Sequence, residues 1–154
     1  MIIKKELTYH TPWFKVIAKY VNGFNQPYFA LEMSDYVTVL AITDDNKILL
    51  VEQYRPVLET STLEFPSGHI EKNEIPKNAA KRELFEETGY RACEMILLGD
   101  MYSDTGRHEN KLWGYFANEV KLETETYQES SNISVKHVPI SKFKDLINDG
   151  KFKL

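Results

Sequence analysis

Three glutamates, Glu83, Glu86 and Glu87, fall within five residues near the middle of the chain. On a helix, residues three and four apart face the same side, so these carboxylates repel one another by roughly a few tenths of a kcal/mol per pair. Arg82 can reach Glu86 four residues later, but one arginine cannot neutralise three acids. Carboxylate oxygens are preferred ligands of Mg²⁺ and Mn²⁺, and magnesium often joins them to substrate phosphates. The spacing therefore indicates metal-assisted phosphate chemistry, with a solvated acidic helix face as the alternative.

A helix must hold these acids in place, and the sequence predicts it over Pro76–Thr88. Proline suits the first turn of a helix, and Gly89 stands where a left-handed C-terminal cap is favoured. At 100° per residue the acids border the side that also carries Ala79, Ala80 and Leu84, which is the side expected to be buried. A short strand over residues 62–65 and a turn over 66–68 come just before. The segment therefore reads as strand, loop and helix.

The rest of the chain is predicted to form mainly strands. Alternating residues on both sides of the Asn-Gly turn in "NGFNQ" predict an N-terminal β-hairpin over 14–21 and 27–33. Two β-branched runs around "DDNK" predict a second hairpin in the covered centre of a sheet. Further strands are expected over 94–102, 111–120 and 133–139, and a helix over 141–150. We expect a single α/β domain over residues 1–154, with 1–35 as an N-terminal hairpin extension and helices on both sheet faces.

Composition excludes several classes of protein. The chain has 154 residues and a formal net charge of −4, which argues against binding nucleic acid by phosphate neutralisation. Its longest apolar runs are far too short to span a membrane. Cys93 is the only cysteine, so no intrachain disulfide can form. We expect a cytoplasmic protein with neither a nucleic-acid nor a membrane partner.

The segment from Gly68 to Tyr90 resembles the signature of the Nudix hydrolases at every fixed position. The residues that carry the resemblance are Gly68, Glu74, Arg82, Glu83, Leu84, Glu86, Glu87 and Gly89. Tyr90 is a small departure from the signature, since an aliphatic residue is more usual at that position. A chance match of eight residue types at set spacings is very rare. The resemblance therefore disfavours the alternative of a solvated acidic helix face.

The resemblance implies a Nudix fold, an α/β/α sandwich with a mixed central sheet, to which the N-terminal hairpin is added. It implies that Glu83, Glu86 and Glu87 bind Mg²⁺ or Mn²⁺ and are catalytic, with the main-chain carbonyl of Ser67 as a further ligand. Gly68, Glu74 and Arg82 match positions that support the loop, the last two by ion pairing.

Features outside the signature resemble the ADP-ribose and nucleotide-sugar pyrophosphatase branch. These are "VEQYRP", "TLEFPSGHIE" and the N-terminal "WFKV". In that branch Gln53 and Arg55 would bind substrate, the guanidinium contacting phosphate or ribose. Phe14 matches an aromatic residue that stacks on the nucleobase across a dimer interface, with Trp13 as its rival. A homodimer is implied.

Two features leave the substrate and the base open. The loop "SDTGRHEN" keeps Ser103 and Glu109 but lacks the proline usual in this branch. In several relatives a glutamate from a late loop orients the attacking water. Glu129 matches that position best, with Glu125 and Glu109 as alternatives.

These features together predict metal-dependent hydrolysis of a nucleoside diphosphate linked to another moiety. ADP-ribose, cleaved to AMP and ribose 5-phosphate, is the expected substrate. A nucleoside diphosphate sugar such as GDP-mannose, or a dinucleoside polyphosphate, is the alternative. A Nudix-fold module that senses a nucleotide without cleaving it is a rival from another class, although such proteins usually lack some of the metal acids that are present here. The net charge also disfavours an RNA-decapping role.

Overall fold

The computed structural model describes residues 1–123 and 132–153. Within these ranges, no helix is long and apolar enough to cross a bilayer. The elements, in chain order, are β1 (Ile2–His10), β2 (Phe14–Val21), β3 (Tyr28–Met33), β4 (Tyr36–Thr43), β5 (Lys47–Arg55), β6 (Thr60–Glu64), β7 (Ser67–His69), α1 (Pro76–Thr88), β8 (Tyr90–Arg91), β9 (Ile96–Tyr102), β10 (Lys111–Leu122), β11 (Ile133–Pro139) and α2 (Ile140–Asn148).

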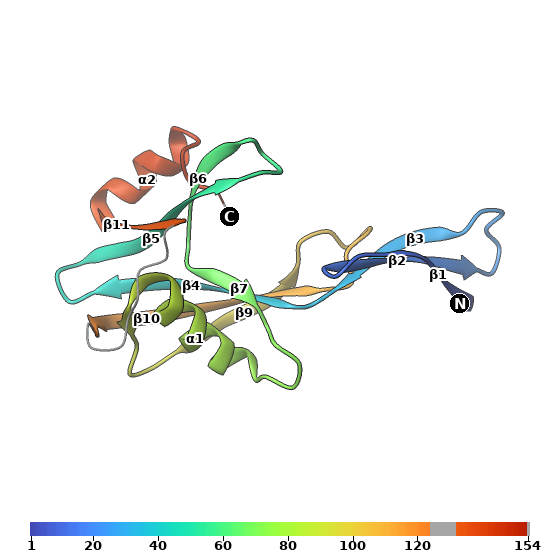
Figure 1. The fold of residues 1–154 in the computed structure, drawn as a ribbon, viewed down its shortest axis with the longest axis horizontal. Coiled ribbons are helices and arrows are strands. Elements are labelled where there is room, and N and C mark those ends of the chain that lie inside the picture. Colours follow the sequence, from blue (N-terminus) through green and yellow to red (C-terminus); the bar gives the residue numbers. More distant parts are fainter. Residues whose placement is uncertain (124–131, 154) are drawn as a thin grey trace.

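The main sheet is mixed, with the strand order β11-β5-β4-β10-β8. Strands β4 and β10 run parallel, whereas the other described pairs are antiparallel. Strands β4 and β5 share the register pair Ile42 and Ile48. Beyond that pair, β7 lies beside β4 and β6 lies beside β5. Figure 1 shows the opening that results between these two halves of the sheet.

The two helices lie on opposite faces of this sheet, which confirms the predicted sandwich (Figure 1). Alternate residues of β4, namely Val37, Val39 and Ala41, form a core cluster with Ala79, Ala80 and Leu84 of α1. Burial of this apolar stripe fixes α1 against the sheet. Helix α1 begins at Pro76, and Gly89 caps it with a φ of 75° and an N–H bond to the Phe85 carbonyl, as the sequence predicts.

The N-terminal region forms a separate antiparallel sheet in the order β1-β2-β3. Figure 1 shows it extending away from the main sheet. The hairpin of β2 and β3 agrees with the sequence prediction, but β1 was not predicted. Its residues, "IIKKELTYH", do not alternate cleanly, and all nine are exposed. Pairing with β2 therefore makes this strand, since local pattern does not.

Only Ser34 and Asp35 separate β3 from β4. The Asp35 carboxylate accepts hydrogen bonds from the Lys111 backbone N–H at 2.8 Å and from the Trp113 indole Nε1 at 3.1 Å. The N-terminal sheet also touches the loop before β10, where Leu31 N donates to the Arg107 carbonyl at 2.7 Å. These bonds attach the N-terminal sheet to β10.

The segment just before α1 differs from its prediction. Residues 66–68 were expected to form a turn, because proline and glycine usually mark one. Instead, Ser67–His69 form β7, and Ser67 and Gly68 pair with Thr38 and Val37 of β4. Cross-strand pairing overrides the local turn signal here and places Ser67 beside the acids of α1.

Candidate active site

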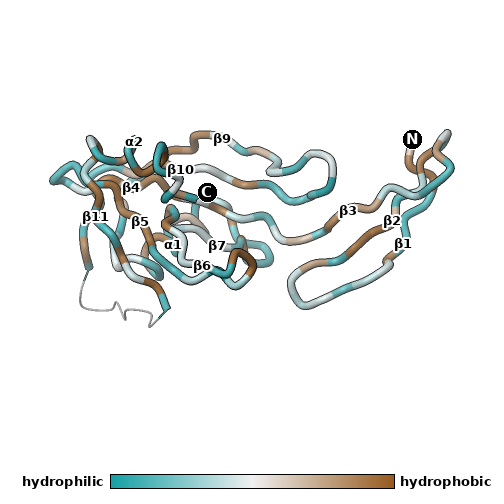
Figure 2. Tube along the Cα trace, turned by 90° about the horizontal axis from the view of Figure 1, so that it is seen from above, coloured by the Kyte–Doolittle hydropathy of each residue, from teal (hydrophilic) through white to brown (hydrophobic). Residues whose placement is uncertain are grey.

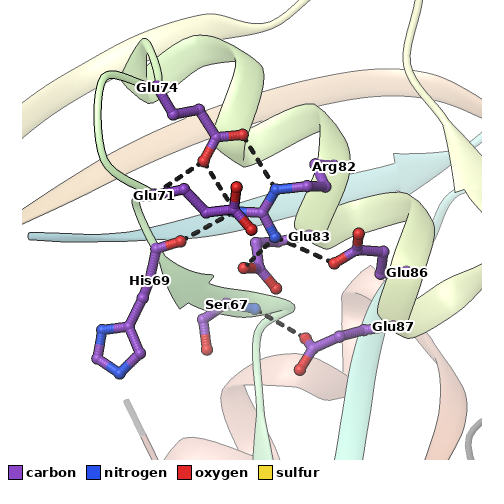
Figure 3. Close-up of polar contacts among 8 residues, drawn as sticks. All are labelled: Ser67, His69, Glu71, Glu74, Arg82, Glu83, Glu86 and Glu87. Carbon is purple, nitrogen blue, oxygen red and sulfur yellow. Dashed lines mark hydrogen bonds and ion pairs between the residues drawn. The ribbon is translucent and has the colours of Figure 1, made fainter. Parts of the chain in front are cut away.

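Arg82 is the centre of the ion pairs around α1 (Figure 3). Its guanidinium donates to both carboxylate oxygens of Glu74, at 3.0 and 2.9 Å, and to the His69 carbonyl at 2.9 Å. Its Nη1 donates to Glu83 at 2.7 Å and to Glu86 at 3.0 Å. Hydrogen bonds from Arg82 hold the pKa of Glu74 below its usual value. One guanidinium thus ties the loop before the helix to two of its acids.

Gly68 leaves space for the Glu83 carboxylate. A Cβ atom at residue 68 would lie 2.1 Å from Glu83 Cδ, which no real pair of carbon atoms tolerates. Burial raises the pKa of Glu83, although the bond from Arg82 opposes that rise. The glycine is required because the main chain of β7 and this carboxylate are in direct contact.

Glu87 meets the same strand through a hydrogen bond. The Ser67 backbone N–H donates to Glu87 Oε2 at 2.9 Å. Burial raises the pKa of Glu87 to about 7, and the negative charge of Glu83 adds to the rise, while the Ser67 bond opposes it. A cation beside this carboxyl would favour its charged form.

The donor set suits a hard divalent cation. Glu83, Glu86 and Glu87 supply carboxylate oxygens on one side of α1, and Ser67 supplies a carbonyl nearby. In the arrangement seen, Glu83 and Glu86 point to Arg82 (Figure 3). Accordingly, no three acidic, histidine or cysteine side chains converge on one point among residues 1–123 and 132–153. The two carboxylates would have to rotate away from Arg82 to share an ion.

A cavity of about 560 Å³ lies against this region. Its walls come from both halves of the divided sheet, with Thr38, Ser67 and Gly68 on one side and Arg55 and Glu64 on the other. The remaining lining is mainly apolar and includes Met33, Tyr36, Leu58, Phe65 and Leu112. Ser67 and Gly68 therefore contact the acids of α1 and also line the cavity.

Arg55, a predicted substrate-binding residue, lies in the cavity wall. It donates from Nε and Nη2 to the two oxygens of Glu64, at 2.9 and 2.6 Å. Gln53, predicted with it, pairs with Thr62 across the strands and is not among the described lining residues. The substrate-binding role of these two residues stays a prediction.

The predicted base-stacking residues lie in the N-terminal sheet. Phe14 is half-buried and pairs with Met33, which lines the cavity. Trp13, its rival, is 74% exposed. The structure thus brings Phe14 next to a cavity residue and leaves Trp13 in solvent.

The candidate bases lie in two places. Glu109 forms an ion pair with Lys19 of β2, and its neighbour Asn110 lines the cavity instead. Ser103, from the same loop, lies within hydrogen-bond distance of His108 Nδ1, at 3.0 Å. Glu125 and Glu129 fall outside the described residues. The choice of base is untested.

Sequence reasoning missed two residues of the cavity, Thr38 and Asn110. Both are buried, and their side-chain oxygens have no hydrogen-bond partner within the described chain. Thr38 reads as one more β-branched strand residue, and Asn110 as one more loop residue. Only the three-dimensional arrangement reveals them, so no sequence signal could have found them.

Known proteins of similar sequence match part of this chain. An ADP-ribose pyrophosphatase of Bacillus subtilis is 40% identical over 86 residues, which is 56% of this chain and 46% of that protein. A methanol dehydrogenase activator of Bacillus methanolicus is 57% identical over 60 residues, or 39% and 32% of the two chains. The chain thus spans less than half the length of these two curated relatives.

The fold and the signature place the chain in a family. A crystal structure of an ADP compounds hydrolase matches all of this chain and 85% of its own, with a TM-score of 0.83 and 23% identity, which shows a shared fold. The family described as "NUDIX domain" matches residues 34–153, well over half of the chain. The chain therefore belongs to the NUDIX family.

Proposed function

We propose that the protein hydrolyses the pyrophosphate bond of a nucleoside diphosphate linked to another moiety, with ADP-ribose as the favoured substrate. The observation that carries the proposal is the contact of Glu83 and Glu87 with β7, the strand that also lines the cavity. Carboxylates that can hold a metal thus adjoin a space for substrate. The names of the Bacillus subtilis relative and of the structural neighbour agree with this chemistry.

Enzymes of this family generally use divalent metal ions, and we propose Mg²⁺ or Mn²⁺ here. Glu83, Glu86, Glu87 and the Ser67 carbonyl would hold the metal. A bound cation of this kind neutralises phosphate oxygens and lowers the pKa of water. The bonds between Arg82 and Glu74 hold the loop against α1, which keeps β7 and the helix in a fixed relative position.

The chain's other residues would position the substrate and the water. Water adds to one phosphorus, the bond from that phosphorus to the bridging oxygen breaks, and AMP and ribose 5-phosphate leave. Glu129 is the favoured base to take the water proton, with Glu109 and Glu125 as alternatives. Arg55 would exchange part of its contact with Glu64 for a substrate phosphate, an exchange suited to a forked donor. Gln53 and Phe14 are further substrate contacts, Phe14 by stacking on the base.

We also propose that the protein is a single-domain homodimer that acts in the cytoplasm. Large apolar side chains are exposed on the N-terminal sheet and on β9, among them Ile3, Leu7, Phe29, Leu98 and Met101. Figure 2 shows hydrophobic stretches along both regions. Exposed apolar surface of this extent is typical of an interaction site, and a second copy would cover it.

Mononucleotide release from a substrate panel tests the function. ADP-ribose, GDP-mannose and a dinucleoside polyphosphate would each be incubated with Mg²⁺, with Mn²⁺ and with EDTA. The proposal expects ADP-ribose to be cleaved fastest, with cleavage abolished by EDTA. Faster metal-dependent cleavage of another panel member would replace the substrate but keep the enzyme class. Nucleotide binding without turnover would instead establish a sensor.

A further inference from the structure

Two buried oxygens of the cavity wall lack a partner in the protein. Thr38 is 9% exposed and Asn110 is 3% exposed, and both side chains line the cavity. Neither Thr38 Oγ1 nor Asn110 Oδ1 has a hydrogen-bond partner in the described part of the chain. Buried polar atoms in native proteins are nearly always hydrogen-bonded. Two such atoms in one cavity therefore point to a ligand that completes them.

The strand registers and the cavity lining place both residues on the same side of the sheet. Thr38 pairs with Ser67 of β7, and Tyr36 pairs with Leu112 of β10. Paired residues share a face, and side chains alternate along a strand. Asn110 immediately precedes β10, two residues before Leu112, and lines the same cavity as Leu112.

Thr38 is linked to the acids of α1 through its neighbour on β7, although its side chain points to the sheet face opposite the one that packs on α1. Its register partner Ser67 donates its N–H to Glu87. Residues that pair across strands have Cβ atoms about 5 Å apart. The Thr38 hydroxyl thus lies one strand away from the residue that contacts a proposed metal ligand, so it would meet a part of the substrate near the scissile bond.

The chemistry of the two groups selects that part. A hydroxyl donates and accepts, and a carboxamide oxygen accepts, so both suit neutral hydroxyl groups. Arg55 and Lys153 line the same cavity and can pair with phosphate oxygens, whereas Thr38 and Asn110 carry no charge for that task. In a nucleoside diphosphate sugar, a sugar is joined directly to each phosphate, whereas the base lies one ribose further away. A sugar therefore fits both the position and the chemistry.

We infer that Thr38 and Asn110 determine substrate specificity by hydrogen-bonding hydroxyls of the sugar attached to the scissile pyrophosphate. This inference rests on the proposed function and adds the recognition of the sugar to it. A site built to bond a hydroxyl discriminates strongly against an analogue without it, because its polar atoms are then left without partners. The two residues would thus favour substrates whose sugar carries these hydroxyls over substrates that lack them.

The test compares ADP-ribose with two analogues that lack the 2- or the 3-hydroxyl of the terminal ribose. The ratio of kcat/KM values would be measured for the wild-type protein and for Thr38→Val, Asn110→Leu and Thr38→Ser. We expect the wild type to prefer ADP-ribose over at least one analogue by tenfold or more, on the order of one lost hydrogen bond or greater. Thr38→Val and Asn110→Leu should bring that preference toward one. Thr38→Ser, which keeps the hydroxyl, should retain it.

Stability provides a second readout and a matched control. Thr43, on the same strand, is also buried, but its hydroxyl bonds Asp45 at 2.5 Å and accepts from Lys47 N at 3.1 Å. Thr43→Val should therefore lower Tm and leave the substrate preference unchanged. Thr38→Val should keep or raise Tm, because it removes an oxygen that has no protein partner.

The outcomes separate the two proposals. Unchanged preference in both Thr38→Val and Asn110→Leu would overturn the inference, as would a Tm loss in Thr38→Val equal to that of Thr43→Val. Wild-type protein that cleaves no panel member would instead overturn the proposed function, and the inference with it. Turnover with a lost preference supports both.

Discussion

Two regions differ in the chemistry of their surfaces: the segment from β7 to the end of α1 is highly charged, and the N-terminal sheet exposes apolar side chains. In the first, charged groups are compensated within the segment, since Arg82 alone bonds Glu74, Glu83 and Glu86. In the second, apolar side chains face solvent, including Ile3, Leu7 and Phe29. The difference shows what each region still needs: the acids of α1 would be stabilised by a cation, and the sheet by an apolar surface.

The ion pairs of the two regions also differ in weight. Those of the N-terminal sheet, such as Lys4 with Glu6 and Lys15 with Glu32, join largely exposed groups. Exposed pairs of this kind contribute little to stability. The Arg82 pairs with Glu74 and Glu83 are less exposed and share one guanidinium. The ion pairs of the first region therefore add to its apolar packing against β4, whereas those of the second contribute little beside strand pairing.

The largest effect is expected at Glu87. Glu87→Gln removes a carboxylate that contacts β7 and that would hold the metal, so kcat should fall by roughly 10²- to 10³-fold, the scale of a lost electrostatic contact in catalysis. Steady-state kinetics with saturating Mg²⁺ checks this, with circular dichroism to confirm the fold. Glu94→Gln, an exposed loop acid, is the control. Near-normal turnover of Glu87→Gln would remove this residue from the mechanism.

Gly68→Ala should disturb the same region through its packing. The new Cβ would meet Glu83 Cδ at 2.1 Å, so the strand or the carboxylate must move. We expect a drop in Tm of about 5 °C or more, together with weaker metal binding. At Gly114, a Cβ would lie 3.8 Å from the nearest atom, so Gly114→Ala is the matched control. Equal Tm values for the two variants in a thermal melt would contradict the close contact.

A substitution on the N-terminal sheet should change the oligomeric state of the protein. Leu7→Lys places a charge on an exposed apolar position of β1, so the proposed dimer should dissociate and the molar mass should fall by half. Light scattering after size-exclusion chromatography measures this. Asn25→Lys, which adds the same charge at an exposed polar residue between β2 and β3, is the control and should leave the mass unchanged. A monomeric wild type, or a dimer in Leu7→Lys, would refute a role for this face in assembly.

The smallest effect concerns pH in the metal-free protein. The pKa of Glu87 is about 7 in the fold, above its ordinary value of 4.5. Its contribution to stability is therefore fully present below pH 4.5 and is lost as the pH rises through 7. In EDTA, Glu87→Gln should gain on the wild type by on the order of a few degrees in Tm between pH 5 and pH 8. A difference in Tm that stays constant with pH would show that Glu87 does not titrate in this range.

Local pattern predicted most of the fold. Proline and glycine bounded α1 correctly, and the runs around "DDNK" gave β4 and β5. The three missed strands, β1, β7 and β8, have in common that their pairing partners, rather than their own residues, make them strands. Tertiary contact decides such segments, and a single sequence does not contain it in readable form.

The candidate site divides in the same way. The spacing of Glu83, Glu86 and Glu87 was legible because one helix carries all three. Thr38 comes from β4 and Asn110 from the loop before β10, and both matter because of a contact that they lack in the protein. Missing partners leave no mark on sequence, so recognition of the sugar could only be inferred once the cavity was known.

The connection between the two sheets has a mechanical consequence. With only Ser34 and Asp35 between β3 and β4, and with Asp35 bonded to Lys111 and Trp113, few backbone torsions are available to reorient the N-terminal sheet. The N-terminal sheet is therefore held in a fixed orientation relative to β4 and β10. A displacement of the N-terminal sheet, such as one caused by a binding partner, would therefore also displace β4 and β10, which carry Thr38 and Leu112.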